Sequence, residues 1–279
     1  MNRSFLLWTL AVIITLLTAY YQRTTGPTYP IDEIISINKT EYHIKLLRSH
    51  GGETDCKIEI PIEQKLISAK LVWKRFKTND EWSEVKFEIE DGKLIAELPN
   101  QPPAGKLEYY IVIYHDTQKY VLPHEETAVI RFKGDVPIWV LIPHVIVMFG
   151  AMLLATRTGL EFFAKEPKVK GLTQWTLGFI FAGGLILGPI TQYYAFDAFW
   201  TGFPFGTDLT DNKTLVAFIV WIVVYLIYRK SKKPQLWALV GAIITTVIYL
   251  IPHSLHGSEL DYNELDKQNQ QIEIEQSFE

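Results

Sequence analysis

The apolar residues of this chain gather in five long runs, and the stretch between the first and second runs has a different pattern. The runs span 5–21, 136–156, 172–192, 214–228 and 236–252 and contain almost no charged residues. Runs of this length approach what a helix needs to cross about 30 Å of hydrocarbon. The runs 214–228 and 236–252 are short, so we expect flanking Lys and Arg side chains to reach the membrane surface and complete the span. The pattern predicts five transmembrane helices.

The stretch 27–135 alternates between apolar and polar residues instead. Alternation in Lys57-Ile58-Glu59-Ile60 and in 86–89 is typical of half-buried strands. Asp91-Gly92 predicts a hairpin turn, because both central positions accept a positive φ, and 102–105 predicts another turn. The predicted strands are 42–48, 57–62, 69–76, 85–89, 94–98, 107–114 and 129–132. Short strands at this spacing predict an all-β sandwich.

Three features of this stretch occur together in a known type of module. They are a tryptophan strand at Leu71-Val72-Trp73, a proline-glycine turn at 101–105 and a strand with Tyr109-Tyr110-Ile111. In this order they resemble fibronectin type III and immunoglobulin-like modules, over about a third of the chain. The resemblance implies a β-sandwich inserted between the first and second helices. Such modules commonly bind partners or act as spacers, so the resemblance implies no catalytic role.

Lysine and arginine are unevenly distributed between the connections. Loops 157–171 and 229–235 carry Arg157, Lys165, Lys168, Lys170, Arg229, Lys230, Lys232 and Lys233. Loop 193–213 and tail 253–279 carry only Lys213 and Lys267. Because cytoplasmic loops are enriched in Lys and Arg, this predicts a cytoplasmic N-terminus, with the β-sandwich and the C-terminal tail outside.

The predicted organisation has four parts. Residues 1–26 form a signal-anchor helix, 27–135 the extracytoplasmic β-sandwich, 136–256 a four-helix membrane domain and 257–279 an acidic extracytoplasmic tail, expected to be flexible or a short helix. A cleaved signal peptide is the alternative for the first part, but residues 18–23 lack the small-x-small pattern of a cleavage site. Cys56 is the one cysteine, so we interpret it as a packed residue in a domain without disulfides. These features favour the cytoplasmic (inner) membrane of a bacterium.

Charge and motifs exclude several functions. The net charge is −4 and no basic stripe occurs outside the short loops, which argues against nucleic acid as a partner. The expected partners are the lipid bilayer and a protein bound by the β-sandwich. The chain contains no GxSxG elbow, Walker loop, dinucleotide fingerprint or HExxH motif.

One place in the chain could hold a chemical site: the outer mouth of the predicted bundle. His144 lies inside the second run, where a titratable side chain is a functional hypothesis by default. His253 and His256 follow the fifth run with i, i+3 spacing, and Asp208 lies in the loop before the fourth run. Further residues expected to support the pocket are Asp197, Trp200, Asp211, Lys213 and Glu259.

These residues permit three interpretations. Imidazole and carboxylate ligands suit a divalent metal such as zinc or iron, for which we name His144, His253, His256 and Asp208. Alternatively, His144 and His253 are the axial ligands of a b-type haem. In a purely structural interpretation His144 donates to a neighbouring carbonyl, and Asp211 caps the fourth helix.

Two functional hypotheses follow. The chain is either a membrane metalloprotein or redox component with its site at the outer mouth, or a non-catalytic envelope scaffold or assembly subunit whose β-sandwich binds a partner. A transporter is a third, weaker hypothesis, because the five runs show no obvious repeat. Substrate, partner identity and oligomeric state do not follow from the sequence.

Overall fold

The computed structural model describes residues 3–62, 67–253, 255 and 257–276. The chain divides into two units, which are considered separately. The bundle unit comprises Met1–Pro27 and Val136–Ser258, and the β unit comprises Thr28–Asp135 and Glu259–Glu279.

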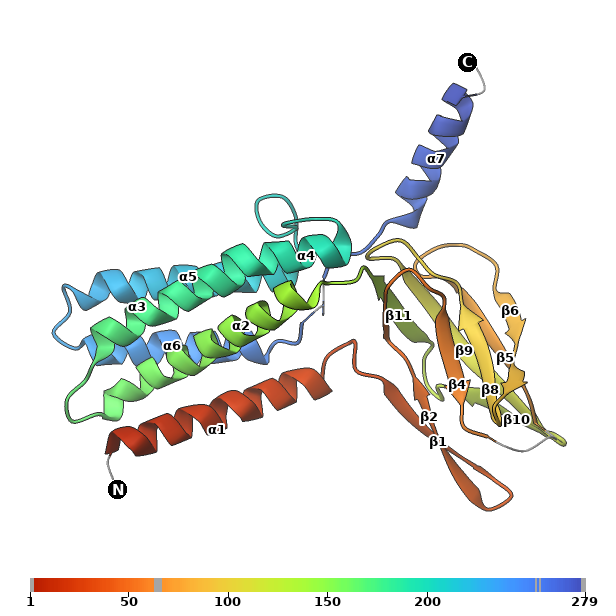
Figure 1. Cartoon of the computed structure of the whole chain (residues 1–279), viewed down its shortest axis with the longest axis horizontal. Helices are drawn as coiled ribbons and strands as arrows, with labels where there is room; N and C mark the ends of the chain where they lie inside the picture. Colours follow the sequence, from red (N-terminus) through yellow and green to blue (C-terminus); the bar gives the residue numbers. More distant parts are fainter. Residues whose placement is uncertain (1–2, 63–66, 254, 256, 277–279) are drawn as a thin grey trace. The chain divides into compact units, whose positions relative to one another are not determined.

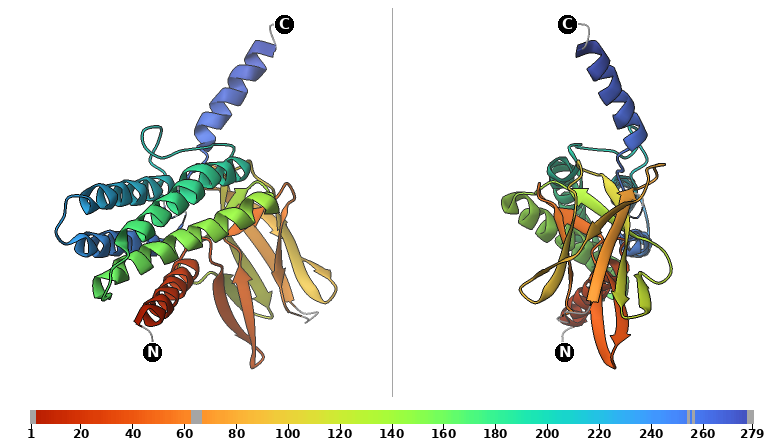
Figure 2. Two further views of the ribbon diagram at one scale, coloured as in Figure 1. Left: turned by 60° about the vertical axis from the view of Figure 1, so that its left-hand side comes forward. Right: turned by 90° about the vertical axis from the view of Figure 1, so that its right-hand side faces the viewer.

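The bundle unit consists of apolar helices that pack side by side (Figures 1 and 2). They are α1 (Arg3–Thr24), α2 (Ile138–Gly159), the 3-10 turn η1 (Leu160–Phe163), α3 (Val169–Ile180), the π-helical segment η2 (Phe181–Leu187), α4 (Gly188–Phe196), α5 (Leu209–Tyr228) and α6 (Pro234–Leu250). Each predicted apolar run overlaps one helical segment: α1, α2, the continuous α3–η2–α4, α5 and α6. The α1, α2–η1, α3–η2–α4 and α5 segments are long and apolar enough to cross a membrane, whereas α6 is apolar but has only 17 residues.

Small residues allow the helices of the bundle unit to approach closely. A Cβ atom at Gly184 would lie 2.5 Å from Cγ2 of Thr214 on α5, and one at Gly159 would lie 2.3 Å from Cβ of Ala242 on α6. Packing of this kind is what holds helices together in a lipid environment, where apolar surface gains nothing by leaving lipid.

The surface of the bundle unit is unusually apolar. Leu17 on α1 is 63% exposed, Trp139 on α2 is 69% exposed and Ile146 is 63% exposed. Soluble proteins rarely expose contiguous apolar surface of this extent. These helices therefore have the composition of segments surrounded by hydrocarbon.

The β unit contains three sheets. Its strands are β1 (Ile31–Ile37), β2 (Thr40–Leu46), β3 (Ser49–Gly51), β4 (Cys56–Ile60), β5 (Ile67–Arg75), β6 (Ser83–Lys86), β7 (Glu88–Glu90), β8 (Lys93–Leu98), β9 (Lys106–His115), β10 (Gln118–Leu122) and β11 (Ala128–Lys133). One sheet has the order β3-β11-β9-β5-β6, with β10 also paired to β9; the others are β4-β8-β7 and β1-β2. Pairing is antiparallel except between β11 and β3.

All seven predicted strands are present, with one of them divided. Residues 85–89 contribute to both β6 and β7, because Phe87 leaves both ladders and donates its backbone N–H to the carbonyl of Ala69. Asp91 and Gly92 both have positive φ in the turn between β7 and β8, as predicted. Strands β1, β3 and β10 were missed. Of these, β3 has three residues, too few to show alternation.

A single apolar core joins the sheets of the β unit. Ile44 from β2, Ile58 from β4, Leu98 from β8 and Ile111 from β9 belong to one cluster of buried side chains. Cys56 is part of this cluster and is fully buried, which confirms it as a packed residue. The hydroxyl of Tyr109 donates to the carbonyl of Leu47, so the one polar atom of this buried ring is satisfied.

The C-terminal segment is fastened to the β unit. It contains the helix α7 (Tyr262–Gln276), whose first residue is buried and donates its hydroxyl to Oε1 of Gln101 and to the carbonyl of Lys106. The backbone N–H of Leu260 donates to the carbonyl of Ala104. Arg75 bonds Asp266 through both terminal nitrogens at 2.8 Å. The polar tail expected from sequence is therefore helical and held in place near its start.

Candidate functional site

The connection between α4 and α5, residues 197–208, is held by two carboxylates. Asp208 is the N-cap of α5, and its Oδ1 accepts hydrogen bonds from the backbone N–H groups of Thr210 and Asp211. Its Oδ2 accepts from the backbone N–H and from the hydroxyl of Ser258, at 2.7 and 3.0 Å. Asp208 thus joins the start of α5 to the segment that follows α6.

Asp211 holds the loop itself. Its Oδ2 accepts from the backbone N–H groups of Thr201 and Gly202, at 2.7 and 3.0 Å, and the residue is buried. The sequence analysis offered Asp211 as the cap of this helix; the cap is Asp208. The reason is local: the chain becomes helical at Leu209, so the side chain one residue earlier reaches the free N–H groups.

Two side chains satisfy the free carbonyls at the end of α6. Nζ of Lys213, which is buried, donates to the carbonyl of Ile251 at 2.8 Å. Nε2 of Gln22, from the end of α1, donates to the carbonyl of Tyr249 at 2.8 Å and to that of Ile251. Carbonyls at a helix end lack partners within the helix, and these two side chains supply them.

His144 is fixed by a single backbone contact. Its Nδ1 lies 3.0 Å from the carbonyl oxygen of Gly183, in the π-helical segment. Because a carbonyl only accepts, Nδ1 carries the proton, and neutral His144 therefore has an unprotonated Nε2. The same carbonyl also accepts from the backbone N–H of Gly188, which is the i to i+5 bond of the π segment.

His253 is electrically close to the other predicted site residues. Its pKa is lowered, first by desolvation and then by the proximity of Lys213 and His144. The carboxylate of Asp208 acts on it in the opposite direction. Lys213 also donates to the carbonyl of Ile251, two residues before His253, so it lies near the segment that carries His253. His256 lies outside the described residues.

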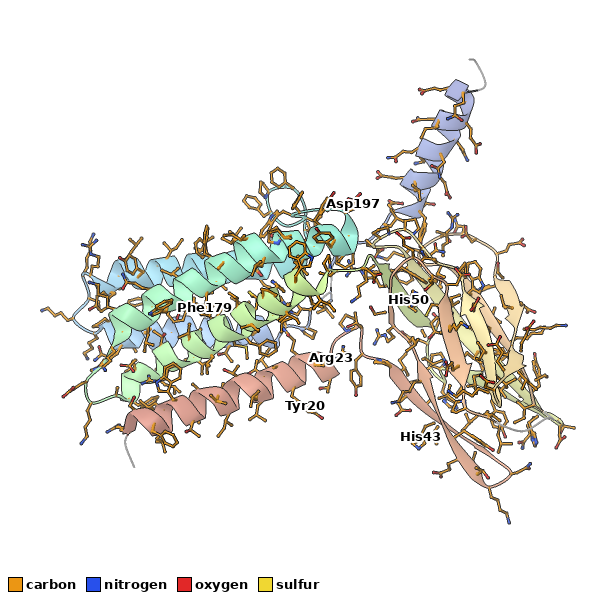
Figure 3. All side chains as sticks on the ribbon, viewed as in Figure 1. Tyr20, Arg23, His43, His50, Phe179 and Asp197 are labelled. Carbon is orange, nitrogen blue, oxygen red and sulfur yellow. The ribbon has the colours of Figure 1, made fainter. Side chains whose placement is uncertain are left out.

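The remaining predicted residues have other positions. Asp197 is the left-handed C-cap of α4 and is exposed (Figure 3). Nε1 of Trp200 donates to the carbonyl of Phe203. Glu259 belongs to the β unit, where it pairs with Lys106 at 2.5 Å and with Lys77 at 2.7 Å. Among the described contacts of Asp197, Trp200 and Glu259, none is made with His144.

Among the described residues, no three His, Cys, Asp or Glu side chains are grouped so that they could hold a metal ion. The chemistry of the region explains this finding in part. The carboxylates of Asp208 and Asp211 accept hydrogen bonds from backbone N–H groups. The ammonium of Lys213 interacts electrostatically with His253, and a positive charge there opposes the binding of a metal cation. A set that includes His256 remains a prediction.

Arg157 and Glu161 form a second group of polar residues in the bundle unit, which the sequence did not identify. Arg157 and Glu161 form an ion pair at the end of α2, with only 4% and 1% of their surfaces exposed. Glu161 also accepts the backbone N–H of Lys168, and the guanidinium of Arg157 lies 5.2 Å from the ring centroid of Trp8 on α1.

The sequence analysis counted Arg157 as a loop cation. The structure extends α2 to Gly159 and continues it as η1, so the four-residue spacing of Arg157 and Glu161 becomes a contact on one helical face. That spacing is the signal in the sequence that could have identified the pair.

Comparison of the chain with protein-family models, with curated proteins and with solved structures finds no match.

Replacing Asp208 by Ala removes the helix cap and frees Ser258. We expect a loss of about 1–2 kcal/mol in stability, the usual cost of losing an N-cap. Asp197→Asn is the control, since this exposed residue keeps its left-handed conformation as Asn, and it should change stability by less than about 0.5 kcal/mol. Thermal unfolding of the detergent-purified chain measures both. Equal stability of the two variants would contradict the capping role.

Proposed function

We propose that the chain is a five-span protein of the bacterial cytoplasmic membrane that displays an immunoglobulin-like β-sandwich on the outer side, where the sandwich binds a protein partner. The observation that carries this proposal is the attachment of the C-terminal segment to the β unit. It bears on the number of crossings and on the side that the β unit occupies.

The number of spans follows from parity. The β unit precedes α2, and the segment attached to it by Leu260, Tyr262 and Asp266 follows α6. Both therefore lie on one side of the membrane, so the chain between them crosses an even number of times. The helices α2, α3–α4 and α5 supply three crossings. Crossing by α6 supplies the fourth, and α1 makes five in total.

The length of α6 is compatible with this role. Its 17 residues extend about 26 Å at 1.5 Å per residue. That is somewhat less than an average hydrocarbon thickness of about 30 Å, and a deficit of this size is met by local thinning and by side chains that reach the interface. Lys232 and Lys233 directly precede the helix.

The side is assigned by charge. The connections from η1 to α3 and from α5 to α6 carry Lys165, Lys168, Arg229, Lys230, Lys232 and Lys233, whereas the α4–α5 loop carries no lysine or arginine. The positive-inside rule therefore favours a cytoplasmic location for the two basic connections and an outer location for the β unit.

The β unit offers one face suited to a partner. Val72, Tyr110 and Val112 lie on the side of β5 and β9 that faces away from the core. Trp82 packs edge-on against Tyr110, with ring centroids 5.2 Å apart, and Val72 is only 2% exposed. Tyr114 and Val121 extend the same face, which we call the aromatic face.

The composition of the aromatic face is that of a binding surface. Trp82, Tyr114 and Val121 are each about 40% exposed. Charged pairs flank the apolar centre: Lys74 with Glu108 at 3.2 Å, and Lys70 with Glu84 at 2.7 Å. Tryptophan and tyrosine dominate binding energy at protein interfaces, and a polar rim around an apolar centre is the usual arrangement.

Labelling of single cysteines with a membrane-impermeant maleimide tests the topology. We expect cysteines at Lys119, Asp197 and Lys267 to react on intact spheroplasts, and one at Lys232 to react only after the membrane is opened. The native Cys56 should not react with the maleimide, because it is fully buried and burial raises its thiol pKa to about 11. If the cysteine at Lys119 reacted and the one at Lys267 did not, the two would lie on opposite sides of the membrane, and the prediction of five spans would be wrong.

Photo-crosslinking in the native membrane tests the aromatic face. A crosslinking residue at Tyr114 should give an adduct of one defined mass, and the same residue at Lys57, on the other sheet, should not. Trp82→Ala should reduce the Tyr114 adduct about tenfold, as expected for removal of an interface hot spot. Equal adducts at both positions, or none at Tyr114, would contradict the proposal.

One observation favours the metal or redox hypothesis as a second candidate. Histidines that bind metals usually donate their other ring N–H to a carbonyl or carboxylate, and His144 does so to Gly183, which leaves Nε2 to act as a ligand. The substitution His144→Gln keeps the donor and removes the ligand.

Metal analysis and the absorption spectrum of the purified chain test this candidate. If His144 and His253 hold a metal or haem, His144→Gln and His253→Ala should lower the metal content or abolish the spectrum. His124→Ala, at a histidine paired with Glu33 in the β unit, is the control and should change neither. Unchanged content and spectrum in both site variants would exclude the candidate.

A further inference from the structure

A shallow hollow lies in the bundle unit where α3 begins and α5 ends. It has a volume of about 330 Å³ and is lined by Pro167, Lys168, Lys170, Gly171, Leu172, Trp175 and Tyr228. A Cβ atom at Gly171 would have no neighbour within 4 Å, so the space beside this backbone is open. The hollow lies at the end of the bundle unit that contains the Arg157–Glu161 pair.

Two lysines, Lys168 and Lys170, give the lining of the hollow a positive charge. Lys168 and Lys170 are exposed, and neither forms an ion pair in the part of the chain that the structure describes. Glu161, on the preceding turn, pairs with Arg157 and accepts the backbone N–H of Lys168, and Glu166, two residues before Lys168, forms no ion pair among the described residues. The chain continues from Tyr228 into Arg229 and Lys230, which add further positive charge.

The walls of the hollow suit the boundary between headgroups and hydrocarbon. Trp175 is 64% exposed and packs edge-on against Phe179, and Tyr228 is the last residue of the apolar helix α5. Aromatic rings of this kind are enriched where a helix leaves the hydrocarbon. The hollow therefore combines cations for an anionic group with apolar walls for the chains attached to it.

We propose that this hollow binds the phosphate-bearing headgroup of an anionic phospholipid from the cytoplasmic leaflet. Lys168 and Lys170 contact the phosphate, and Trp175 and Tyr228 pack against the glycerol and the first methylenes. Basic pockets between helices on the cytoplasmic side are a recognised mode of anionic lipid binding. The inference rests on the membrane topology proposed above, but not on partner binding or on the His144 region.

Native mass spectrometry of the full chain, released from nanodiscs, tests the site. With phosphatidylglycerol we expect a retained lipid adduct and a raised unfolding temperature, neither of which phosphatidylethanolamine produces. Lys168→Gln with Lys170→Gln should weaken retention about tenfold or more, given the contribution of each cation near an anionic surface. Gly171→Leu, which keeps both lysines and places a side chain in the open space, should weaken it as well.

Lys232→Gln with Lys233→Gln is the matched control, because it removes the same charge on the same side of the membrane but outside the hollow. Loss of the adduct in this control to the same extent would overturn the site in favour of unspecific attraction. Stabilisation by inorganic phosphate alone would overturn the lipid assignment. Absence of lipid selectivity in a chain whose labelling shows the expected topology would refute the lipid site and leave the proposed function intact.

Discussion

The bundle unit depends on one constraint: hydrocarbon offers no hydrogen bonds, so polar backbone groups at the ends of apolar helices must find partners inside the protein. The chain meets this requirement at both ends of the bundle unit with polar and charged side chains. At one end, Asp208 and Asp211 accept the N–H groups of the α4–α5 loop, while Lys213 and Gln22 donate to the carbonyls that end α6. At the other end, Glu161 accepts the N–H of Lys168 and pairs with Arg157.

This constraint changes how polar residues near a membrane are interpreted. A carboxylate, a lysine and two histidines in one region resemble a chemical site, and the sequence analysis treated them so. In the structure most of these groups already have backbone partners, so the carboxylates are less available as ligands. His144 differs, since its one contact leaves Nε2 without a backbone partner among the described residues. At the other end of the bundle unit, Lys168 and Lys170 are exposed cations that line a hollow, and they are available to a ligand because they form no ion pair among the described residues.

The β unit solves a different problem. Its one cysteine is free and buried, and one apolar core shared by its sheets stabilises it. That core buries one face of β5 and β9 and leaves the other face to Trp82, Tyr110 and Tyr114. The C-terminal segment adds contacts through Tyr262 and Arg75, where Arg75 also holds the pKa of Asp80 below its ordinary value by hydrogen bonding. This attachment, which follows α6 in the chain, is the basis of the proposed number of membrane crossings.

The sequence by itself determined the elements whose signal is local. Apolar runs predicted the five helical segments of the bundle unit, alternation predicted seven strands, and Asp91-Gly92 predicted its turn. Each of these signals depends only on neighbouring residues. Tertiary structure decided what depends on residues far apart in the chain. The three-residue strand β3 exists only because β11 pairs with it, Arg157 is buried only because α2 continues toward Glu161 beside Trp8, and Ser258 meets Asp208 across 50 residues. Periodicity carries no record of such contacts, since it describes which face a residue occupies and not what that face will meet.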